Sequence, residues 1–246
     1  MPEMISFGGG VNSVAMTIML VEQGWRGPIV FADTGGEWPE TYCYLRTFED
    51  WLEPHGLSIT RVSVATHPHL YDDKRLGGLV DTLEGYCLHR GIIPLLAVRW
   101  CTVEFKRTPL ENWREAHDIG RTLLGISASE PRRIRDDPNV RYPLWQNAIT
   151  RGECRRIIQE AGLPQPIKSG CFFCPGQRLD NWQRLYHEHR DLYERAIAIE
   201  DNASEHCQKW ATLDPHGISL RQHAKKRWNG QTRMDFTEWL PCLCSL

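Results

Sequence analysis

The chain has 246 residues, of which 41% are hydrophobic and 24% are charged. This composition excludes fibrous and disordered classes and is typical of a globular protein with one large or two small domains. The 29 Lys and Arg residues nearly balance the 31 Asp and Glu residues, which gives a formal net charge of −2. Broad non-specific binding to nucleic acid or membranes therefore has no electrostatic basis, and nucleic acid remains only as a ligand of a local site.

The charge is unevenly distributed along the chain. Residues 1–98 hold 6 basic and 12 acidic residues, residues 99–190 hold 16 and 11, and residues 191–246 hold 7 and 8. Arginine outnumbers lysine 23 to 6, and the planar guanidinium suits bidentate contacts to phosphate or sulfate. We expect an anion to bind in the middle segment, although Arg-rich surfaces are also common without a ligand.

The N-terminal sequence MPEMISFGGG lacks the basic start and apolar core of a secretory signal. No stretch approaches the roughly 18 apolar residues that a membrane span needs. The nine cysteines are odd in number and spread along the chain, which favours a reduced compartment and a metal site over a disulfide framework. We therefore expect a cytoplasmic protein that does not enter a membrane.

The first elements in chain order alternate between strand and helix. Residues 4–7 and 28–31 are predicted as strands on either side of a helix over residues 13–22, and residues 57–64 as a third strand after a helix over residues 38–52. Strands separated by helices indicate a parallel sheet that binds its ligand at the carboxyl ends of the strands.

The later elements are less regular. Residues 67–91 have few periodic apolar positions and are predicted as a mobile insertion. Helical patterns are expected at residues 101–117, 151–161 and 179–200, a strand at residues 122–126, and an Arg-rich loop at residues 128–142. We predict an α/β fold, an open and mostly parallel twisted sheet with helices on both faces, in a domain over residues 1–180 followed by a helical C-terminal extension over residues 181–246.

A glycine loop follows the first predicted strand. Gly8, Gly9 and Gly10 lie between strand and helix, where backbone N–H groups and the helix N-terminus form an anion cradle. Ser6 and Ser13 add hydroxyl donors. The loop fits neither the dinucleotide fingerprint nor the lysine-containing P-loop, and the alternative is a plain tight turn.

Two segments resemble motifs of a known family and occur in the same order as in that family. Residues 6–13 resemble the PP-loop of the adenine nucleotide alpha-hydrolase superfamily, usually S-G-G-x-D-S, with Gly8 at the first serine and Asn12 at the aspartate. Residues 31–41, FADTGGEWPET, resemble the F-x-D-T-G-x-x-x-P-E-T segment of the phosphoadenosine phosphosulfate (PAPS) reductase family. Residues 99–110 and 125–133 resemble that family's C-x-x-x-x-K-x-x-P and G-I-R-x-x-E-S-x-x-R segments, so the resemblance covers residues 4–180.

The resemblance implies that the loop binds the phosphates of ATP or of an adenylyl sulfate, with Mg²⁺ neutralising charge where ATP is cleaved. The nucleotide contacts expected from it are Ser6, Gly8, Gly9, Gly10, Asn12, Ser13, Asp33, Thr34, Gly35 and Gly125. Catalytic roles are expected for Asp33, Lys106 and Arg133. A turn aspartate and a surface lysine are the alternatives for Asp33 and Lys106.

Two departures from the family pattern bear on the chemistry. Asn12 lacks the carboxylate charge and Val11 replaces a frequent lysine, so nucleotide binding is better supported than ATP cleavage. Ser127 stands where the family often has arginine, and Arg132, Arg133 and Arg135 remain open as its replacement.

Cys171 and Cys174 form a C-x-x-C between aromatic residues and a proline, a spacing that lets two thiolates face one metal ion. A thioredoxin-type redox pair and unmetallated buried thiols are the alternatives. In iron–sulfur members of the resembled family an earlier cysteine joins the C-x-x-C, and this implies Cys101 as a ligand. Because Thr102 occupies the place of a second adjacent cysteine, we expect Cys154 to complete the set.

The expected cofactor of these four cysteines is a [4Fe–4S] cluster, with Zn²⁺ as the alternative. Cys242 and Cys244 lie near the C-terminus, where a redox role or a substitute ligand is open, and Cys87 has no assigned role.

Three functions follow as hypotheses. The first is ATP-dependent adenylation or sulfur transfer on a small-molecule, nucleobase or tRNA acceptor, and the second is reduction of PAPS or adenylyl sulfate. The third is a non-catalytic nucleotide-binding component of a larger complex. The scattered tryptophans are assigned to the core and to subunit contacts, which leaves a homodimer open.

Overall fold

The structure is a computed structural model that describes residues 1–64, 81–207 and 211–228. Its centre is a five-stranded parallel sheet in the order β3-β2-β1-β4-β5. The strands are β1 (Glu3–Ser6), β2 (Ile29–Ala32), β3 (Ile59–Val62), β4 (Arg121–Leu124) and β5 (Val140–Arg141). The predicted parallel sheet is confirmed.

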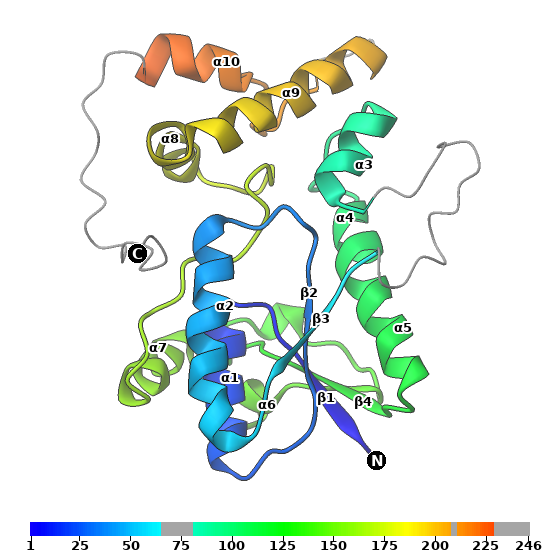
Figure 1. Cartoon of the computed structure of the whole chain (residues 1–246), viewed down its shortest axis with the longest axis vertical. Helices are drawn as coiled ribbons and strands as arrows, with labels where there is room; N and C mark the ends of the chain where they lie inside the picture. The colour runs from blue at the N-terminus through cyan, green and yellow to red at the C-terminus, as the bar shows by residue number, and fades with distance from the viewer. Residues whose placement is uncertain (65–80, 208–210, 229–246) are drawn as a thin grey trace.

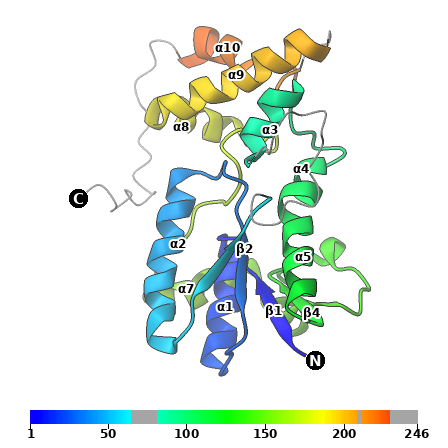
Figure 2. The ribbon, with the colours of Figure 1, turned by 45° about the vertical axis from the view of Figure 1, so that its right-hand side comes forward.

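The helices fall into groups around the sheet. Those associated with the sheet are α1 (Val11–Glu22), α2 (Pro39–Leu52), α5 (Thr108–Ala116), α6 (Pro143–Gln146) and α7 (Arg151–Glu160). The others are α3 (Leu83–Arg90), α4 (Trp100–Thr102), α8 (Leu179–Glu188), α9 (Arg190–Cys207) and α10 (Leu220–His223). Figures 1 and 2 show α1, α2 and α7 on one face of the sheet, α5 on the other, and α8, α9 and α10 as a helical layer beyond one end of it.

Both faces of the sheet are buried, which explains the continuous apolar character of its central strands. Ile5 and Phe7 pack with α1 and α2, whereas Met4 faces the opposite side and packs with Trp113 of α5. β2 alternates in the same way, since Phe31 faces the first side and Val30 the second. Helices therefore cover both faces, as predicted.

A second hydrophobic cluster joins the helical layer to the rest of the molecule. It contains Leu83 of α3, Phe172 and Phe173 of the C-x-x-C segment, Trp182 of α8 and Tyr193 of α9. Residues from both sides of position 180 thus share one core, and the helical extension packs directly on the segment that carries the paired cysteines.

Two predicted elements differ in the structure. Part of the segment expected to lack regular structure forms α3. Its N-cap Thr82 accepts a hydrogen bond from the Gly85 N–H, and its C-cap Gly91 has a φ of 62°. Residues 179–200, predicted as one helical segment, belong to two helices, α8 and α9, that meet at His189. Residues 67–80 of the predicted insertion lie outside the described residues.

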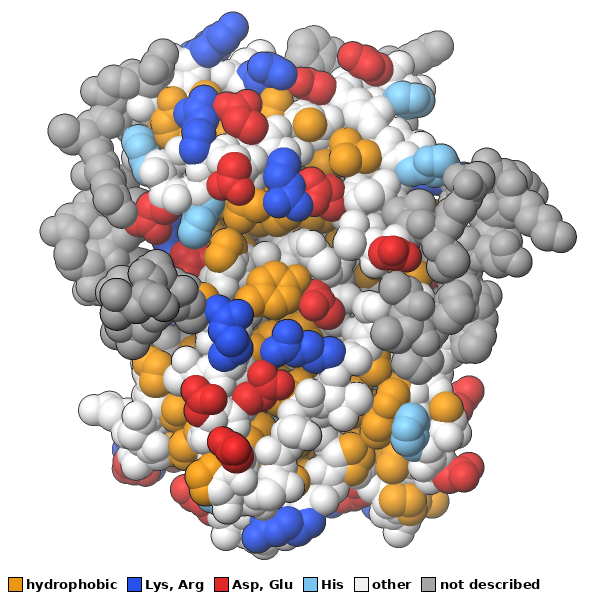
Figure 3. Space-filling view, viewed as in Figure 1, with side chains coloured by type: hydrophobic (Ala, Val, Ile, Leu, Met, Phe, Trp, Pro, Cys, Tyr) orange, Lys and Arg blue, Asp and Glu red, His pale blue; other side chains and the backbone are white. Residues whose placement is uncertain are grey.

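Charged side chains of both signs are interspersed on the face of the molecule seen in Figure 3. That face therefore does not present a surface of one sign, in agreement with the near-neutral net charge. Within the described part of the chain, no helix has the length and apolar character that a membrane crossing requires.

Candidate functional site

The first functional feature is a cavity at the carboxyl ends of β1 and β4. In the sheet, β2 and β3 lie on one side of β1, and β4 and β5 lie on the other. The direction in which successive strands are added therefore reverses at β1. This reversal is where open α/β sheets bind ligands. The cavity has a volume of about 290 Å³, and its lining includes Ser6, Gly8, Gly10, Val11, Asn12, Ser13, Gly125, Arg133, Arg151, Lys168 and Ser169.

The glycine loop supplies one wall of this cavity. Gly10 is the N-cap of α1, and the Ser13 hydroxyl donates a hydrogen bond of 2.9 Å to the Gly10 carbonyl. Gly9 has φ of +66°, a conformation that favours glycine. The first N–H groups of an α-helix lack partners within the helix, and here that end of α1 borders the cavity, as an anion cradle requires.

Gly125 allows the segment after β4 to approach the loop closely. A Cβ atom at Gly125 would lie 2.8 Å from both the backbone N and the Cα of Ser13, closer than such atoms can approach. A side chain at this position would therefore displace either the loop or β4.

Asn12, at the position of the family's aspartate, contacts a carboxylate from another segment. Its amide Nδ2 donates to Glu130 Oε2 at 2.7 Å, and its Oδ1 accepts from Arg151 at 3.3 Å. Arg133 donates to Glu130 Oε1 at 2.7 Å. Burial acts to raise the pKa of Glu130, but the hydrogen bond and charge of Arg133 hold it below its usual value, so the carboxylate is ionised beside the loop.

Three basic side chains line the same cavity: Arg133, Arg151 and Lys168. Arg133 is the residue expected from the sequence, whereas Arg151 and Lys168 were not predicted. Neither Arg132 nor Arg135 is among the lining residues. Cations beside a helix N-terminus favour an anionic ligand.

Asp33 follows β2 on the same edge of the sheet, but it lines a neighbouring cavity of about 260 Å³ together with Gly35 and Arg61. Its Oδ1 accepts hydrogen bonds from the Tyr42 hydroxyl at 2.7 Å and from the Gly35 N–H at 2.8 Å. Burial and the Asp33 carboxylate raise the pKa of Tyr42, so the phenol remains a donor. Asp33 thus shapes the turn after β2 and also borders a cavity.

The segment after Asp33 pairs with the C-x-x-C segment. Glu37 and Cys171 form an isolated antiparallel bridge, and the Phe172 N–H donates to the Gly36 carbonyl at 2.8 Å. The Thr34 hydroxyl lies 3.2 Å from Cys171 Sγ. Thr34, expected to touch the nucleotide, therefore contacts the paired cysteines.

Lys106 lies beside these cysteines and outside the lining of the glycine-loop cavity. Its Nζ is 2.6 Å from Glu37 Oε1, and the Glu37 side chain is completely buried. Burial acts to lower the pKa of Lys106, but the charges of Glu37 and Cys171 raise it above its ordinary value. The described residues offer no hydrogen-bond partner to Glu37 Oε2.

Three of the four cysteines expected to bind metal gather in one place. Cys171 belongs to the second hydrophobic cluster, and Cys101 and Cys174 pack against it. Burial and the Cys174 charge raise the pKa of Cys101, and the Cys171 pKa is also raised, by burial and by Glu37. Binding of a metal to these thiols would therefore release protons.

Cys154 lies elsewhere. It is fully buried in the hydrophobic cluster between α7 and α1, with Ile158 and Val14. Burial raises its pKa to about 11, and the charges that act on it come from its own helix and from Glu130. The structure does not bring Cys154 into the cluster of the C-x-x-C, because its helix α7 packs against α1 and Cys154 belongs to that core.

Cys87 of α3 joins the second cluster instead, and it is 1% exposed. Burial and the charge of Cys101 raise its pKa. Sequence reasoning missed it because α3 itself was not predicted. The second cluster thus brings together four thiols, those of Cys87, Cys101, Cys171 and Cys174, and thiols are a donor type that suits iron–sulfur clusters or zinc and not Mg²⁺. Cys242 and Cys244 lie outside the described residues.

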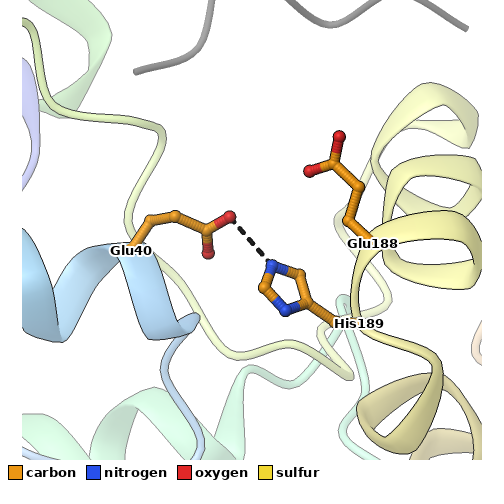
Figure 4. A group of neighbouring side chains, drawn as sticks. All are labelled: Glu40, Glu188 and His189. Carbon is orange, nitrogen blue, oxygen red and sulfur yellow. Dashed lines mark hydrogen bonds and ion pairs between the residues drawn. The ribbon is translucent and has the colours of Figure 1, made fainter. Parts of the chain in front are cut away.

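A further group of metal-ligating side chains is formed by Glu40, Glu188 and His189 (Figure 4). Glu40 Oε1 is 2.9 Å from His189 Nε2. Arg184, with a side chain only 8% exposed, pairs with both Glu40 and Glu188. Because Arg184 pairs with both carboxylates, this group connects α2 to α8 as an ion-pair network.

Comparison with known proteins supports the resemblance. Residues 2–84 match the model of the phosphoadenosine phosphosulfate reductase domain. The uncharacterized nin region protein ORF290 of Escherichia phage lambda is 28% identical over 160 residues, and the match covers 58% of this chain and 53% of that protein. The chain thus spans about half the length of this curated relative.

A crystal structure of PAPS reductase from Candida auris, in a phosphate complex, has 16% sequence identity with this chain and a TM-score of 0.48. The match covers 68% of this chain and 76% of that one. The resemblance to the PAPS reductase family predicted from the motifs is confirmed by the domain match over residues 2–84.

Proposed function

We propose that this chain, whose N-terminal third matches the PAPS reductase domain, binds the phosphate groups of an adenine nucleotide in the glycine-loop cavity. The observation that carries the proposal is the convergence of the glycine loop, the N-terminus of α1 and three basic side chains on one cavity at the strand-order reversal. Backbone N–H groups and guanidinium groups together recognise phosphate and stabilise a departing pyrophosphate.

The reaction that we favour is attack of an acceptor on the α-phosphate of ATP. The P–O bond between the α and β phosphates breaks, pyrophosphate leaves, and the acceptor carries the adenylyl group. In this reaction the loop and Arg133 would hold the leaving pyrophosphate, and Mg²⁺ would offset its charge. Glu130 keeps an ionised carboxylate in contact with Asn12 beside the loop, which favours a catalytic function over a silent binding component.

The second candidate function is reduction of PAPS or adenylyl sulfate, which the domain match favours. This reaction needs a thiolate that attacks the sulfur atom and expels the adenosine phosphate, followed by a thiol reductant that releases sulfite. Both candidates share the same nucleotide site. An activity screen over small molecules, nucleobases and tRNA identifies the acceptor of the first reaction.

We also propose a metal centre of thiolate ligands that include Cys101, Cys171 and Cys174. A [4Fe–4S] cluster would supply electron transfer or structural crosslinking when bound, whereas zinc closed in by four thiolates would supply structural crosslinking alone. Lys168 and Ser169, just before Cys171, line the nucleotide cavity, so the metal-binding segment would position two groups against the nucleotide. Mg²⁺ in the nucleotide site, a cytoplasmic location and a homodimer are further parts of this proposal.

Three assays distinguish these functions. Incubation with ATP, Mg²⁺ and candidate acceptors releases pyrophosphate with an adenylated product under the first function. Sulfite formation from PAPS or adenylyl sulfate with a thiol reductant supports the second. Tight nucleotide binding without turnover in either assay supports the non-catalytic alternative, and absence of binding to ATP, PAPS and adenylyl sulfate contradicts the proposal.

A further inference from the structure

We propose that Cys87 is the fourth thiolate ligand of the metal centre, together with Cys101, Cys171 and Cys174, and that Cys154 is a core residue. This inference rests on the metal centre in the proposed function and names the ligand that completes it. It follows from the placement of α3, a helix that the sequence pattern does not reveal.

Thr34 connects the start of α3 to the paired cysteines. Its carbonyl accepts a hydrogen bond of 2.9 Å from the Leu83 N–H, and its hydroxyl is 3.2 Å from Cys171 Sγ. Leu83 and Cys87 are four residues apart and are the buried residues of α3. Residues with this spacing share one face of a helix, about 6 Å apart along its axis. The Cys87 face of α3 is therefore the face that enters the cluster around Cys171.

Aromatic packing fixes the same helix against the segment of Cys101. The ring centroid of Tyr86 lies 5.5 Å from that of Trp100 and 5.6 Å from that of Phe105. Trp100 directly precedes Cys101, and Tyr86 directly precedes Cys87. Each cysteine thus directly follows one ring of this aromatic contact, which holds the two segments together.

The remaining contacts connect Cys101 to the pair. Cys87 and Cys171 lie in the second hydrophobic cluster, and Cys101 and Cys174 pack against it, so one cluster gathers four thiols from three segments. Lys106 lies near the pair, since the charges of Cys171 and Cys174 act to raise its pKa. A cationic side chain at this place offsets part of the negative charge that four thiolates bring.

A donor set composed of thiols can hold a [4Fe–4S] cluster or a zinc ion, and the two require different separations of the sulfur atoms. Among the described residues, no three cysteine sulfurs lie within 4.8 Å of one another. Four sulfurs around one zinc ion, with Zn–S bonds of about 2.3 Å, would be separated by roughly 3.8 Å. In a [4Fe–4S] cluster each thiolate binds a different iron, so wider separation is required.

The experiment compares two buried cysteines in the full chain, Cys87→Ala and Cys154→Ala. The wild type and both variants are purified without oxygen and reconstituted with ferrous iron and sulfide, and iron, sulfide and absorbance near 400 nm are measured. We expect the wild type and Cys154→Ala to hold four iron and four sulfide per chain. Cys87→Ala is expected to lose more than half of both, or to leave a three-iron cluster visible by electron paramagnetic resonance. Cys101→Ala serves as the positive control.

Circular dichroism and nucleotide titration of the same samples separate loss of the cluster from loss of the fold. If Cys87→Ala is unfolded, Cys87→Ser replaces it, because serine is similar in size to cysteine but binds iron weakly. The expected result for Cys87→Ser is then a changed electron paramagnetic resonance spectrum. A folded Cys87 variant with the iron, sulfide and spectrum of the wild type overturns the proposal, as does loss of the cluster in folded Cys154→Ala. If the wild type binds zinc in place of iron, zinc retained in full by folded Cys87→Ala overturns the proposal in the same way. Nucleotide affinity in the same titration tests the proposed nucleotide site independently.

Discussion

The side-chain amide of Asn12 donates a hydrogen bond of 2.7 Å to the carboxylate of Glu130. This contact joins the glycine loop to the segment after β4 across 118 residues of sequence. The loop lacks the aspartate that is usual in the resembled superfamily, but a carboxylate from another segment stands beside the same position. Position 12 therefore keeps an acidic side chain in contact with it, although its own side chain is an amide.

Restoring the aspartate is expected to harm this protein. Asn12→Asp would remove the amide donor and place two carboxylates in contact, which at pH 7 should lower the free energy of unfolding by about 1–2 kcal/mol. Urea denaturation measures this loss. Asn12→Asp combined with Glu130→Gln should recover most of it because the introduced amide can donate to the new carboxylate. Equal stability of the single variant and the wild type would refute the coupling.

Gly125→Ala is expected to weaken nucleotide binding at least tenfold, because its methyl group would collide with the Ser13 backbone. Calorimetric titration with ATP and Mg²⁺ measures the affinity. Gly152→Ala is the matched control, since a Cβ there meets only Thr150 Oγ1 at the ordinary distance of 3.8 Å. If both variants bind as tightly as the wild type, the close approach at Gly125 has no role in the site.

Removing Lys106 is expected to leave the Glu37 carboxylate buried without its partner. Lys106→Met should lower the free energy of unfolding by roughly 2–3 kcal/mol, less than for a fully enclosed ion pair, because the lysine side chain is 34% exposed. Lys106→Met combined with Glu37→Gln should be less destabilising than the single change. Chemical denaturation of the apoprotein checks both, and a double variant less stable than Lys106→Met would contradict this account.

Glu200 should make stability decrease as the pH rises. Burial raises its pKa to about 7, although the N–H groups of Leu213 and Leu220 act in the opposite direction. In the unfolded chain an ordinary Glu titrates near 4.3. The folded state therefore binds the proton more tightly, and its stabilising effect is complete below about pH 4 and is lost as the pH rises through 7.

Glu200→Gln removes this titration, so the free energy of unfolding should depend less steeply on pH between 5 and 7. Urea denaturation at several pH values measures the slope. Glu205→Gln, an exposed substitution in the same helix, controls for the change in net charge. An unchanged slope in Glu200→Gln would show that this carboxyl does not titrate in that range.

Features determined by local sequence could be predicted. The glycine loop and its flanking strands depend on residues adjacent in the chain, and the parallel sheet follows from strands separated by helices. Ser6, Asn12, Ser13 and Gly125 line the cavity, as expected, because the segments after β1 and β4 emerge at the same edge of the sheet.

Features determined by tertiary packing could not be predicted. α3 has only Leu83 and Cys87 on its buried side, too few for a helical period to be visible, and its stability depends on packing against α9 and the aromatic rings near Cys101. Cys154 is closer in sequence to Cys171 than Cys87 is, but the position of α7 against α1 keeps it apart. The position of Arg151 in the lining of the glycine-loop cavity could not be predicted either, because it depends on α7 beginning beside Asn12.

Hydrogen exchange with and without nucleotide tests the central claim, that the glycine-loop cavity binds an adenine nucleotide. With ATP and Mg²⁺, or with adenylyl sulfate, amide exchange should slow at residues 8–14 and 125–133, and exchange in α9 should remain unchanged. Saturating nucleotide that binds without slowing exchange in either segment, or that slows it only elsewhere, would contradict the account.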